Sequence, residues 1–289
     1  NFSKIKEFLQ FMCGIWLAKI HNKKNASNIQ HRGPDSTKTF IKNEYLFVFH
    51  RLSILDLSSN GDQPINADGT IFMCNGEIYN HQFLRSELDM KFESDSDCEP
   101  VAWMIHKEFD MKYICNSLDG VFAFVAVKDS IIYAARDPIG VRPLYYGLDK
   151  KDGSIAFCSE VKGLKNFCSV VLEFPHGHYY SSETNQFYKY NNIATPPLEL
   201  TTSYYPYTLK NIVEASVKKR LMSDRPVGFF LSGGLDSSLI AAIGAKFLGK
   251  INTYSIGIGD SPDLKAAREV SKFIDSTHTE ITFTEQEGI

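Results

Sequence analysis

The sequence lacks the long hydrophobic and basic runs that mark several classes of protein. No segment approaches the ~20 apolar residues of a membrane-spanning helix, and the apolar stretch before Met12 is too short for the core of a signal peptide. Lysine and arginine are scattered, and the formal net charge is −3. This balance argues against nucleic acid or an anionic membrane as a partner. We therefore expect a cytoplasmic protein that acts on small molecules.

Cysteine is sparse and widely spaced, with no CxxC pair. This usage excludes a dense disulfide scaffold and favours a reduced cytosolic compartment. Most of the thiols should be small buried hydrophobic groups. The six cysteines are Cys13, Cys74, Cys98, Cys115, Cys158 and Cys168.

The remaining composition is that of a soluble globular protein, with 43% hydrophobic and 22% charged residues. A chain of 289 residues has the length for about two domains. It shows no internal repeat and no low-complexity tract.

The first part of the chain predicts a strand-rich α+β domain. Helices are expected over 81–90 and 98–109, the second with Pro100 in its first turn and with Ser94 and Ser96 supplying cap chemistry. Two sheets covered by a few helices would fit this pattern. The expected strands, short, apolar and rich in β-branched or aromatic residues, are 45–51, 70–74, 121–128, 131–135 and 155–158.

Periodicity fades over 191–207, where Pro196, Pro197 and Pro206 indicate a linker. After it, strands and helices alternate, which predicts a parallel α/β sheet. The expected elements are a helix over 208–222, a strand over 227–231, a helix from about 236, a strand over 253–258, a helix over 262–274 and a strand over 279–283.

The segment SGGLDSS, residues 232–238, joins a predicted buried strand to a helix. Backbone N–H groups and the helix N-terminus converge at such a turn and favour an anion, and the hydroxyls of Ser232, Ser237 and Ser238 add donors. No lysine follows the second glycine, so this is not the GxxxxGK[ST] loop. A plain strand-to-helix turn is the alternative.

Asn75-Gly76 between strand-like segments is a strong hairpin signal, and a plain turn is the first interpretation. The second is an oxyanion hole made by the Asn75 amide and the Gly76 N–H, where one donor typically contributes ~3 kcal/mol to the stabilisation of the transition state.

Two charged residues each allow a structural and a functional interpretation. Arg51 is either a surface arginine or a clamp for a substrate carboxylate. Asp97 is either a helix cap, which is preferred, or a counter-charge for a substrate ammonium.

Cys13 follows Met12 directly. If Cys13 were the first residue, its free α-amine (pKa ~8) and its thiol (pKa ~8.5) would be matched, so one residue would serve as base and nucleophile. Inside a peptide bond the nitrogen has no useful basicity. His31 and His50 would replace it only if folding brought them near.

Two further segments are expected to be structural. Residues 136–147, RDPIGVRPLYYG, contain Pro138, Gly140 and Pro143 and predict a rigid turn between strands. His176 and His178 lack cysteine or carboxylate companions at ligand spacing, so we assign no metal site.

Taken together and in this order, the motifs resemble those of the glutamine-hydrolysing asparagine synthetases. The resemblance runs from Cys13 to the last residue. The matching segments are MCGI (12–15), HRGPDS (31–36), HRLSILD (50–56), CNGEIYNH (74–81), SDSDCE (94–99), LDGVFAF (118–124), RDPIGVRPLYY (136–146), SEVKGL (159–164), SGGLDSS (232–238), SIGI (255–258) and SPDLKAAREV (261–270).

The resemblance implies an α+β N-terminal-nucleophile αββα sandwich over 13–195, after an extension over 1–12. In this class II glutaminase domain the Cys13 thiol attacks the glutamine side-chain amide, and Asn75 and Gly76 hold the oxyanion. Arg51 binds the glutamine carboxylate, with Glu77 and Asp97 around its α-amine. Leu52 and Ile54 complete the implied glutamine-binding set.

It also implies a partial α/β parallel-sheet ATP-pyrophosphatase domain over 205–289. There Mg²⁺-ATP converts aspartate to β-aspartyl-AMP, and ammonia from glutamine attacks it. The implied partners are glutamine, aspartate and ATP, and the family allows a homodimer. The implied nucleotide-binding residues are Leu231, Ser232, Gly233, Gly234, Asp236, Ser237, Ser238 and Ile256.

Two features depart from the family pattern. The residues before Cys13 block its α-amine unless they are removed or never translated. The family's ATP domain also continues past Ile289, so we expect a partial sequence and no asparagine synthesis by this chain alone. A related amidotransferase on another carboxylate, an enzyme that only hydrolyses glutamine, and a catalytically silent glutamine- or nucleotide-binding module stay open as alternatives.

Overall fold

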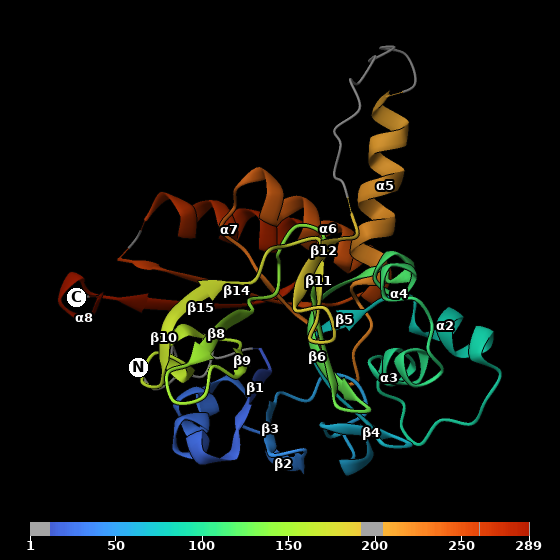
Figure 1. The fold of residues 1–289 in the computed structure, drawn as a ribbon. Coiled ribbons are helices and arrows are strands. Elements are labelled where there is room, and N and C mark those ends of the chain that lie inside the picture. The colour runs from blue at the N-terminus through green and yellow to red at the C-terminus, as the bar shows by residue number, and fades with distance from the viewer. Residues whose placement is uncertain (1–11, 192–204, 260, 289) are drawn as a thin grey trace. The chain divides into compact units, whose positions relative to one another are not determined.

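The computed structural model describes residues 12–191, 205–259 and 261–288. The chain divides into two compact units, with described residues 12–191 in one and those from 205 onward in the other, and each is described by itself (Figure 1). The predicted extension 1–12 and most of the predicted linker 191–207 lie outside the described residues.

The first unit contains two six-stranded sheets whose registered strand pairs are all antiparallel. Sheet A has the strand order β10 (Cys168–Glu173), β8 (Tyr145–Asp149), β9 (Ile155–Cys158), β1 (Gly14–Lys19), β3 (Tyr45–Arg51) and β2 (Ser36–Lys42). Sheet B has the order β12 (Gln186–Lys189), β11 (His178–Ser181), β7 (Ile131–Arg136), β6 (Gly120–Lys128), β5 (Thr70–Ile78) and β4 (Ile65–Ala67).

The two sheets pack face to face through a buried apolar core. Ile15 and Phe49 from sheet A meet Met73 and Val125 from sheet B, and all four are almost fully buried. Alternation along each strand sends the remaining apolar side chains to the outer faces, because successive side chains of a strand point to opposite sides.

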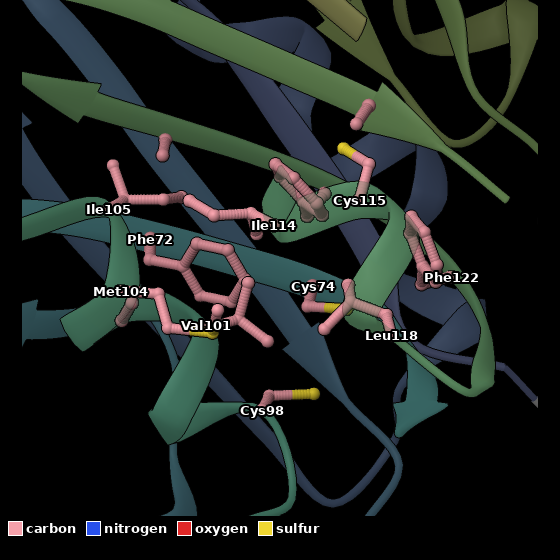
Figure 2. Packing of buried hydrophobic residues seen from close by; sticks show 14 of the residues in the cluster. Phe72, Cys74, Cys98, Val101, Met104, Ile105, Ile114, Cys115, Leu118 and Phe122 are labelled. Carbon is pink, nitrogen blue, oxygen red and sulfur yellow. The ribbon is translucent and has the colours of Figure 1, made fainter. Parts of the chain in front are cut away.

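The outer face of sheet B carries three helices: α2 (His81–Leu88), α3 (Glu99–His106) and α4 (Met111–Ser117). Figure 2 shows Val101, Met104 and Ile105 of α3 against Phe72 and Cys74 of β5. The outer face of sheet A is covered by the 3₁₀ helices η1 (Ile20–Arg32) and η3 (Val161–Gly163), which pack around Trp16. The first unit is therefore an αββα sandwich, as the resemblance implied.

Most predicted elements of this unit are confirmed, with shifts at their ends. The strand predicted over 70–74 continues to Ile78, and the helix predicted over 98–109 ends at His106. Pro100 lies in the first turn of α3, as expected. The cap prediction was wrong, because the N-cap residue is Cys98 and makes no side-chain cap hydrogen bond. The elements that the sequence did not predict are β1, η1, β2, η2 (Ser59–Gly61), β4, α4, β8, η3, β10, β11 and β12.

The second unit contains a three-stranded parallel sheet, as predicted. Its core joins Phe229 and Leu231 with Ala241 of α6 and Ala267 of α7. The elements are α5 (Tyr205–Lys219), β13 (Gly228–Phe230), α6 (Leu235–Leu248), β14 (Asn252–Ile258), α7 (Pro262–Phe273), β15 (Thr277–Phe283) and α8 (Glu285–Gly288).

All six cysteines lie among the described residues and are free, and five of them are buried, as expected. Among the helices that the structure describes, none is long and apolar enough to cross a membrane.

Candidate active site

One cavity in the first unit brings together the whole set of residues that the resemblance assigned to glutamine. They come from the start of β1, the segment after β3, the end of β5 and the segment before α3. A residue from the segment before β8, Arg142, completes the wall. The lining includes Cys13, Arg51, Leu52, Ile54, Asn75, Gly76, Glu77, Asp97 and Arg142.

Cys13 lies directly before β1, where its thiol faces Leu52. The Sγ atom accepts a hydrogen bond from Leu52 N at 3.4 Å and lies 3.5 Å from Leu52 O. Burial raises the pKa of this thiol to about 12, while the positive charge of Arg142 acts in the opposite direction. The thiol is therefore neutral at pH 7 and needs a base before it can act as a nucleophile.

Neither candidate histidine supplies that base. The His31 ring lies 2.9 Å from the carboxylate of Glu160, and the His50 ring contacts Thr37 Oγ1 and Ala26 O. Neither residue lines the cavity. The histidines thus do not replace the α-amine of Cys13.

Asn75 and Gly76 do not form a turn, so the hairpin interpretation was wrong. Both lie inside β5, where Asn75 pairs with Ala123 and Gly76 with Phe122 of β6. The Asn75 side chain is 1% exposed, and its Nδ2 atom has no hydrogen-bond partner. A buried amide donor of this kind is costly unless a ligand pairs with it.

The register directs the Gly76 N–H to the same cavity. Cys74 N bonds the Gln63 side chain and Ile78 N bonds Asp97, so the N–H groups on this edge of β5 point away from β6. Gly76 lies between them with the same orientation, because residues two apart in a strand repeat it. A Cβ atom at Gly76 would overlap Val121 O, which explains the glycine. Two donors therefore face one cavity.

Asp97 is not a helix cap, contrary to the preferred interpretation. Its carboxylate accepts a 2.7 Å hydrogen bond from Ile78 N at the end of β5. Burial, opposed by this hydrogen bond, raises its pKa to about 6. Burial and the charge of Asp97 raise the pKa of Glu77 to about 8. Two carboxylates held this way favour a cation between them.

Arg51 is buried, with 5% exposure, so the surface interpretation was wrong. Its Nη1 donates to Ser58 O and to Asp62 Oδ1, both at 2.8 Å, and its Nη2 donates to Leu55 O and Asp56 O. These bonds fold the segment that carries Leu52 and Ile54 into the wall of the cavity. The role of Arg51 in binding a carboxylate stays a prediction.

Arg142 was missed by sequence reasoning, which treated residues 136–147 as a rigid turn. The turn is confirmed: the buried Asp137 carboxylate accepts hydrogen bonds from the backbone N–H groups of Ile139, Val141 and Arg142. The same turn places the guanidinium of Arg142 at the cavity, where its buried Nε has no partner. The only signal in the sequence was an arginine within a predicted turn that is rich in proline and glycine.

In the second unit, the turn from β13 to α6 forms a small pocket of about 150 Å³. Four residues that the resemblance assigned to ATP line it, namely Leu231, Ser232, Ser237 and Ile256, and Asp263 joins them. Their role in nucleotide binding stays a prediction. The serine hydroxyls of residues 232 and 237 lie 2.9 Å apart.

The other loop residues of the predicted set lie beside this pocket rather than in its wall. Gly233 has φ +77°, and a Cβ atom there would overlap Ala266. Gly234 is the N-cap of α6 and Asp236 lies in its first turn. The Ser238 hydroxyl is buried without a hydrogen-bond partner.

His176 and His178 occupy positions near a strand end, as predicted. His178 begins β11, and the Nδ1 atoms of the two rings lie 2.8 Å from Pro138 O and 2.7 Å from His176 O. These contacts account for both side chains as structural groups.

Two stacked antiparallel sheets between helical layers, with a cysteine at the head of β1 in a cavity of amide donors, define an N-terminal-nucleophile amidotransferase fold. The chain belongs to the glutamine amidotransferase domain family, which matches residues 12–195. Residues 208–289 match the asparagine synthase family.

Curated relatives agree with both matches. Asparagine synthetase [glutamine-hydrolyzing] 2 of Arabidopsis thaliana is 42% identical over 277 residues, covering 90% of this chain and 47% of the relative. The Zea mays asparagine synthetase is 41% identical over 279 residues, with the same shares. A probable asparagine synthetase of Dictyostelium discoideum is 39% identical over 318 residues, covering 96% of this chain and 56% of the relative. The chain thus spans about half the length of these relatives.

A solved structure supports the fold. Glutamine phosphoribosylpyrophosphate amidotransferase from B. subtilis aligns with a TM-score of 0.50 at 19% identity, covering 84% of this chain and 64% of that one.

Proposed function

We propose that this chain carries the glutaminase domain and the first part of the ATP-dependent domain of a glutamine-hydrolysing asparagine synthetase. The observation that carries the proposal is the joint presence of the Cys13 thiol, two inward-facing N–H donors and a carboxylate pair in one cavity. The family matches on both parts of the chain support the same reaction.

In the first step, the Cys13 Sγ attacks the side-chain amide carbon of glutamine. The carbonyl oxygen becomes an oxyanion, and the Asn75 Nδ2 and the Gly76 N–H donate to it. Such preorganised donors stabilise the developing charge without reorganisation. Collapse of the intermediate releases ammonia and leaves a thioester, which water then cleaves to glutamate.

The base for this step is the α-amine of Cys13 in an active form that begins at this residue. In the peptide bond to Met12 the nitrogen is an amide, and the hydrogen bonds of the buried thiol go to the backbone of Leu52, which is not a base. Removal of the preceding residues therefore belongs to the proposal.

The substrate ammonium would lie between Glu77 and Asp97, and the substrate carboxylate would lie toward Arg51. An ammonium there would stabilise the ionised forms of two carboxylates whose pKa values are raised in its absence. This arrangement selects an α-amino acid and holds its side chain toward Cys13.

In the second unit, the turn at Ser232–Ser238 would bind the phosphates of ATP, with Leu231 and Ile256 beside the nucleotide. N–H groups at a helix N-terminus and hydroxyl donors suit phosphate oxygens. The carboxylates of Asp236 and Asp263 are oxygen ligands of the kind Mg²⁺ prefers, so these residues would hold the ion that accompanies ATP and offsets phosphate charge. Aspartate is the acceptor, and a cytoplasmic homodimer is part of the same proposal.

The test compares two nitrogen sources in the full-length protein with Cys13 as its first residue. Asparagine should form from aspartate and ATP with either glutamine or ammonia, and Cys13→Ala should abolish only the glutamine-dependent reaction. Equal loss with both sources would contradict the role of Cys13.

A second comparison separates the alternatives. Pyrophosphate release that does not depend on aspartate would favour another acceptor carboxylate. Ammonia release without any ATP-dependent product would indicate an enzyme that only hydrolyses glutamine. Glutamine binding without ammonia release would indicate a silent binding module.

A further inference from the structure

A second cavity lies on the outer face of sheet B, away from the residues of the glutamine site. It is a groove of about 520 Å³ where three connections meet: α3 to α4, β6 to β7, and β11 to β12. Ligand sites in proteins typically have volumes of this order. None of its lining residues belongs to the catalytic proposal.

The floor of the groove is a tyrosine-rich patch of the sheet. Tyr179 of β11 pairs with Tyr188 of β12, and their rings stack with centroids 5.1 Å apart. Tyr133 of β7 pairs with Ser181 of β11 on the same face. Burial raises the pKa values of Tyr133 and Tyr179, so these phenols are neutral at pH 7. The floor therefore offers neutral π-faces.

Ser181 adds a hydroxyl group to this floor. The residue is 6% exposed and lines the groove. Within the described part of the chain its hydroxyl makes no hydrogen bond, although its backbone carbonyl accepts one from Thr184. The hydroxyl is therefore available at the groove wall, where a ligand N–H could donate to it.

The rim is acidic. Four carboxylates line the groove, from Glu108, Asp110, Asp129 and Glu183, against the single cation of Lys128. Lys128 forms a 2.5 Å ion pair with Glu108 and lies 3.9 Å from Asp129. Among the described residues no cation lies within ion-pair distance of Glu183. The groove thus keeps an excess of negative charge over an aromatic floor.

We propose that this groove binds a small organic cation with a guanidinium head. A guanidinium stacks on an aromatic face through its plane and donates N–H bonds from its edge, so one group uses the tyrosines, Ser181 and the free carboxylate together. A quaternary ammonium has no N–H to offer the hydroxyl, and a neutral amide lacks the positive charge that strengthens hydrogen bonds to carboxylates. This site goes beyond the proposed function and does not depend on it.

The test uses butylguanidinium as the probe and butylurea as a neutral control of the same planar shape. Calorimetry on the full chain at low salt should show saturable binding of butylguanidinium and at least tenfold weaker binding of butylurea. Tyr188→Leu and Glu183→Gln should each weaken binding about 3- to 10-fold, the range expected when one cation–π or one charged contact is lost. Glu87→Gln on α2 and Tyr207→Leu on α5, both exposed, are the matched controls and should leave binding unchanged.

Three outcomes would overturn the proposal: no saturable binding, equal binding of the urea, or unchanged binding in both groove variants. The glutamine cavity is also acidic, so displacement of the probe by glutamine, or its loss on Glu77→Gln alone, would assign the binding to that cavity and equally overturn the proposal. If Tyr188→Leu does not melt like the parent chain, Glu183→Gln decides the result, because Glu183 is exposed in a turn.

Discussion

The carboxylate of Asp97 holds the end of the strand that carries Glu77, and burial together with the charge of Asp97 raises the pKa of Glu77 to about 8. The hydrogen bond from Ile78 N fixes Asp97 beside that strand, and no cation among the described residues lies within ion-pair distance of either carboxylate. The cavity therefore contains a carboxylate pair that is costly to ionise without a ligand. The substrate ammonium of the proposed function would offset this charge.

Glutamine binding should release protons near neutral pH. At pH 7 Glu77 is mostly protonated in the free protein, because its pKa is about 8. A bound ammonium stabilises the carboxylate and lowers this pKa, so the proton leaves on binding and affinity should rise between about pH 6 and pH 8. The Cys13→Ala variant, which prevents turnover, allows the measurement by calorimetry in buffers of different ionisation enthalpy. A binding enthalpy independent of the buffer would contradict this assignment, and Glu77→Gln should abolish the proton release.

Glu77→Gln should stabilise the ligand-free protein at high pH while it weakens glutamine binding. The folded-state pKa of Glu77 is raised above its unfolded value of about 4.5. Its favourable contribution to the stability of the folded protein is therefore fully present below pH 4.5 and is lost as the pH rises through about 8. At pH 8.5 the variant should gain on the order of 1–3 kcal/mol, after allowance for solvent screening of a partly buried group. The test is to measure the free energy of unfolding of the variant and of the parent chain in urea at pH 4.5 and 8.5. The same difference between the two proteins at both pH values would refute the prediction.

The sequence predicted β3, β5, β6, β7 and β9, which are apolar and rich in β-branched or aromatic residues, but it missed β1, although five of its six residues are buried. It did not predict β11 and β12, where Tyr179, Tyr180, Phe187 and Tyr188 lie in strands of four residues at the edge of sheet B. Short edge strands with exposed positions carry little periodic signal. The 3₁₀ helix η1, with many polar residues, escaped prediction for the same reason.

Local rules also failed where long-range pairing decides the conformation. Asn75-Gly76 is a turn signal by itself, yet pairing with β6 over Ile71 to Ile78 holds both residues extended. Motif resemblance found these residues because it compares the whole site. Arg142 was missed because its place at the cavity depends on Asp137 binding the turn, which no local pattern reveals.

Asn75→Ala should lower kcat for glutamine hydrolysis by about 10²–10³-fold, the usual cost of one lost oxyanion donor. KM should change little, because the amide acts on the transition state rather than on the bound substrate. Asparagine formation from ammonia should be unaffected. The control is Asn28→Ala, an exposed residue whose side chain bonds Lys162 O in η3. A loss confined to KM would instead assign Asn75 to substrate binding.

The glycine at 233 is required by two features of the turn before α6, which a matched pair of variants separates. Gly233 has φ +77° and no room for a Cβ atom beside Ala266, whereas Gly249 has φ +75° with nothing within 4 Å. Gly249 has ψ −126°, outside the left-handed helical region, so Gly249→Ala should cost only backbone strain, about 1–3 kcal/mol. Gly233→Ala adds a steric overlap that must displace the turn or α7, so it should cost several-fold more and abolish ATP binding at the Ser232–Ser238 segment. Chemical unfolding and nucleotide titration of both variants check this, and equal costs for the two would show that backbone conformation alone selects the glycine at 233.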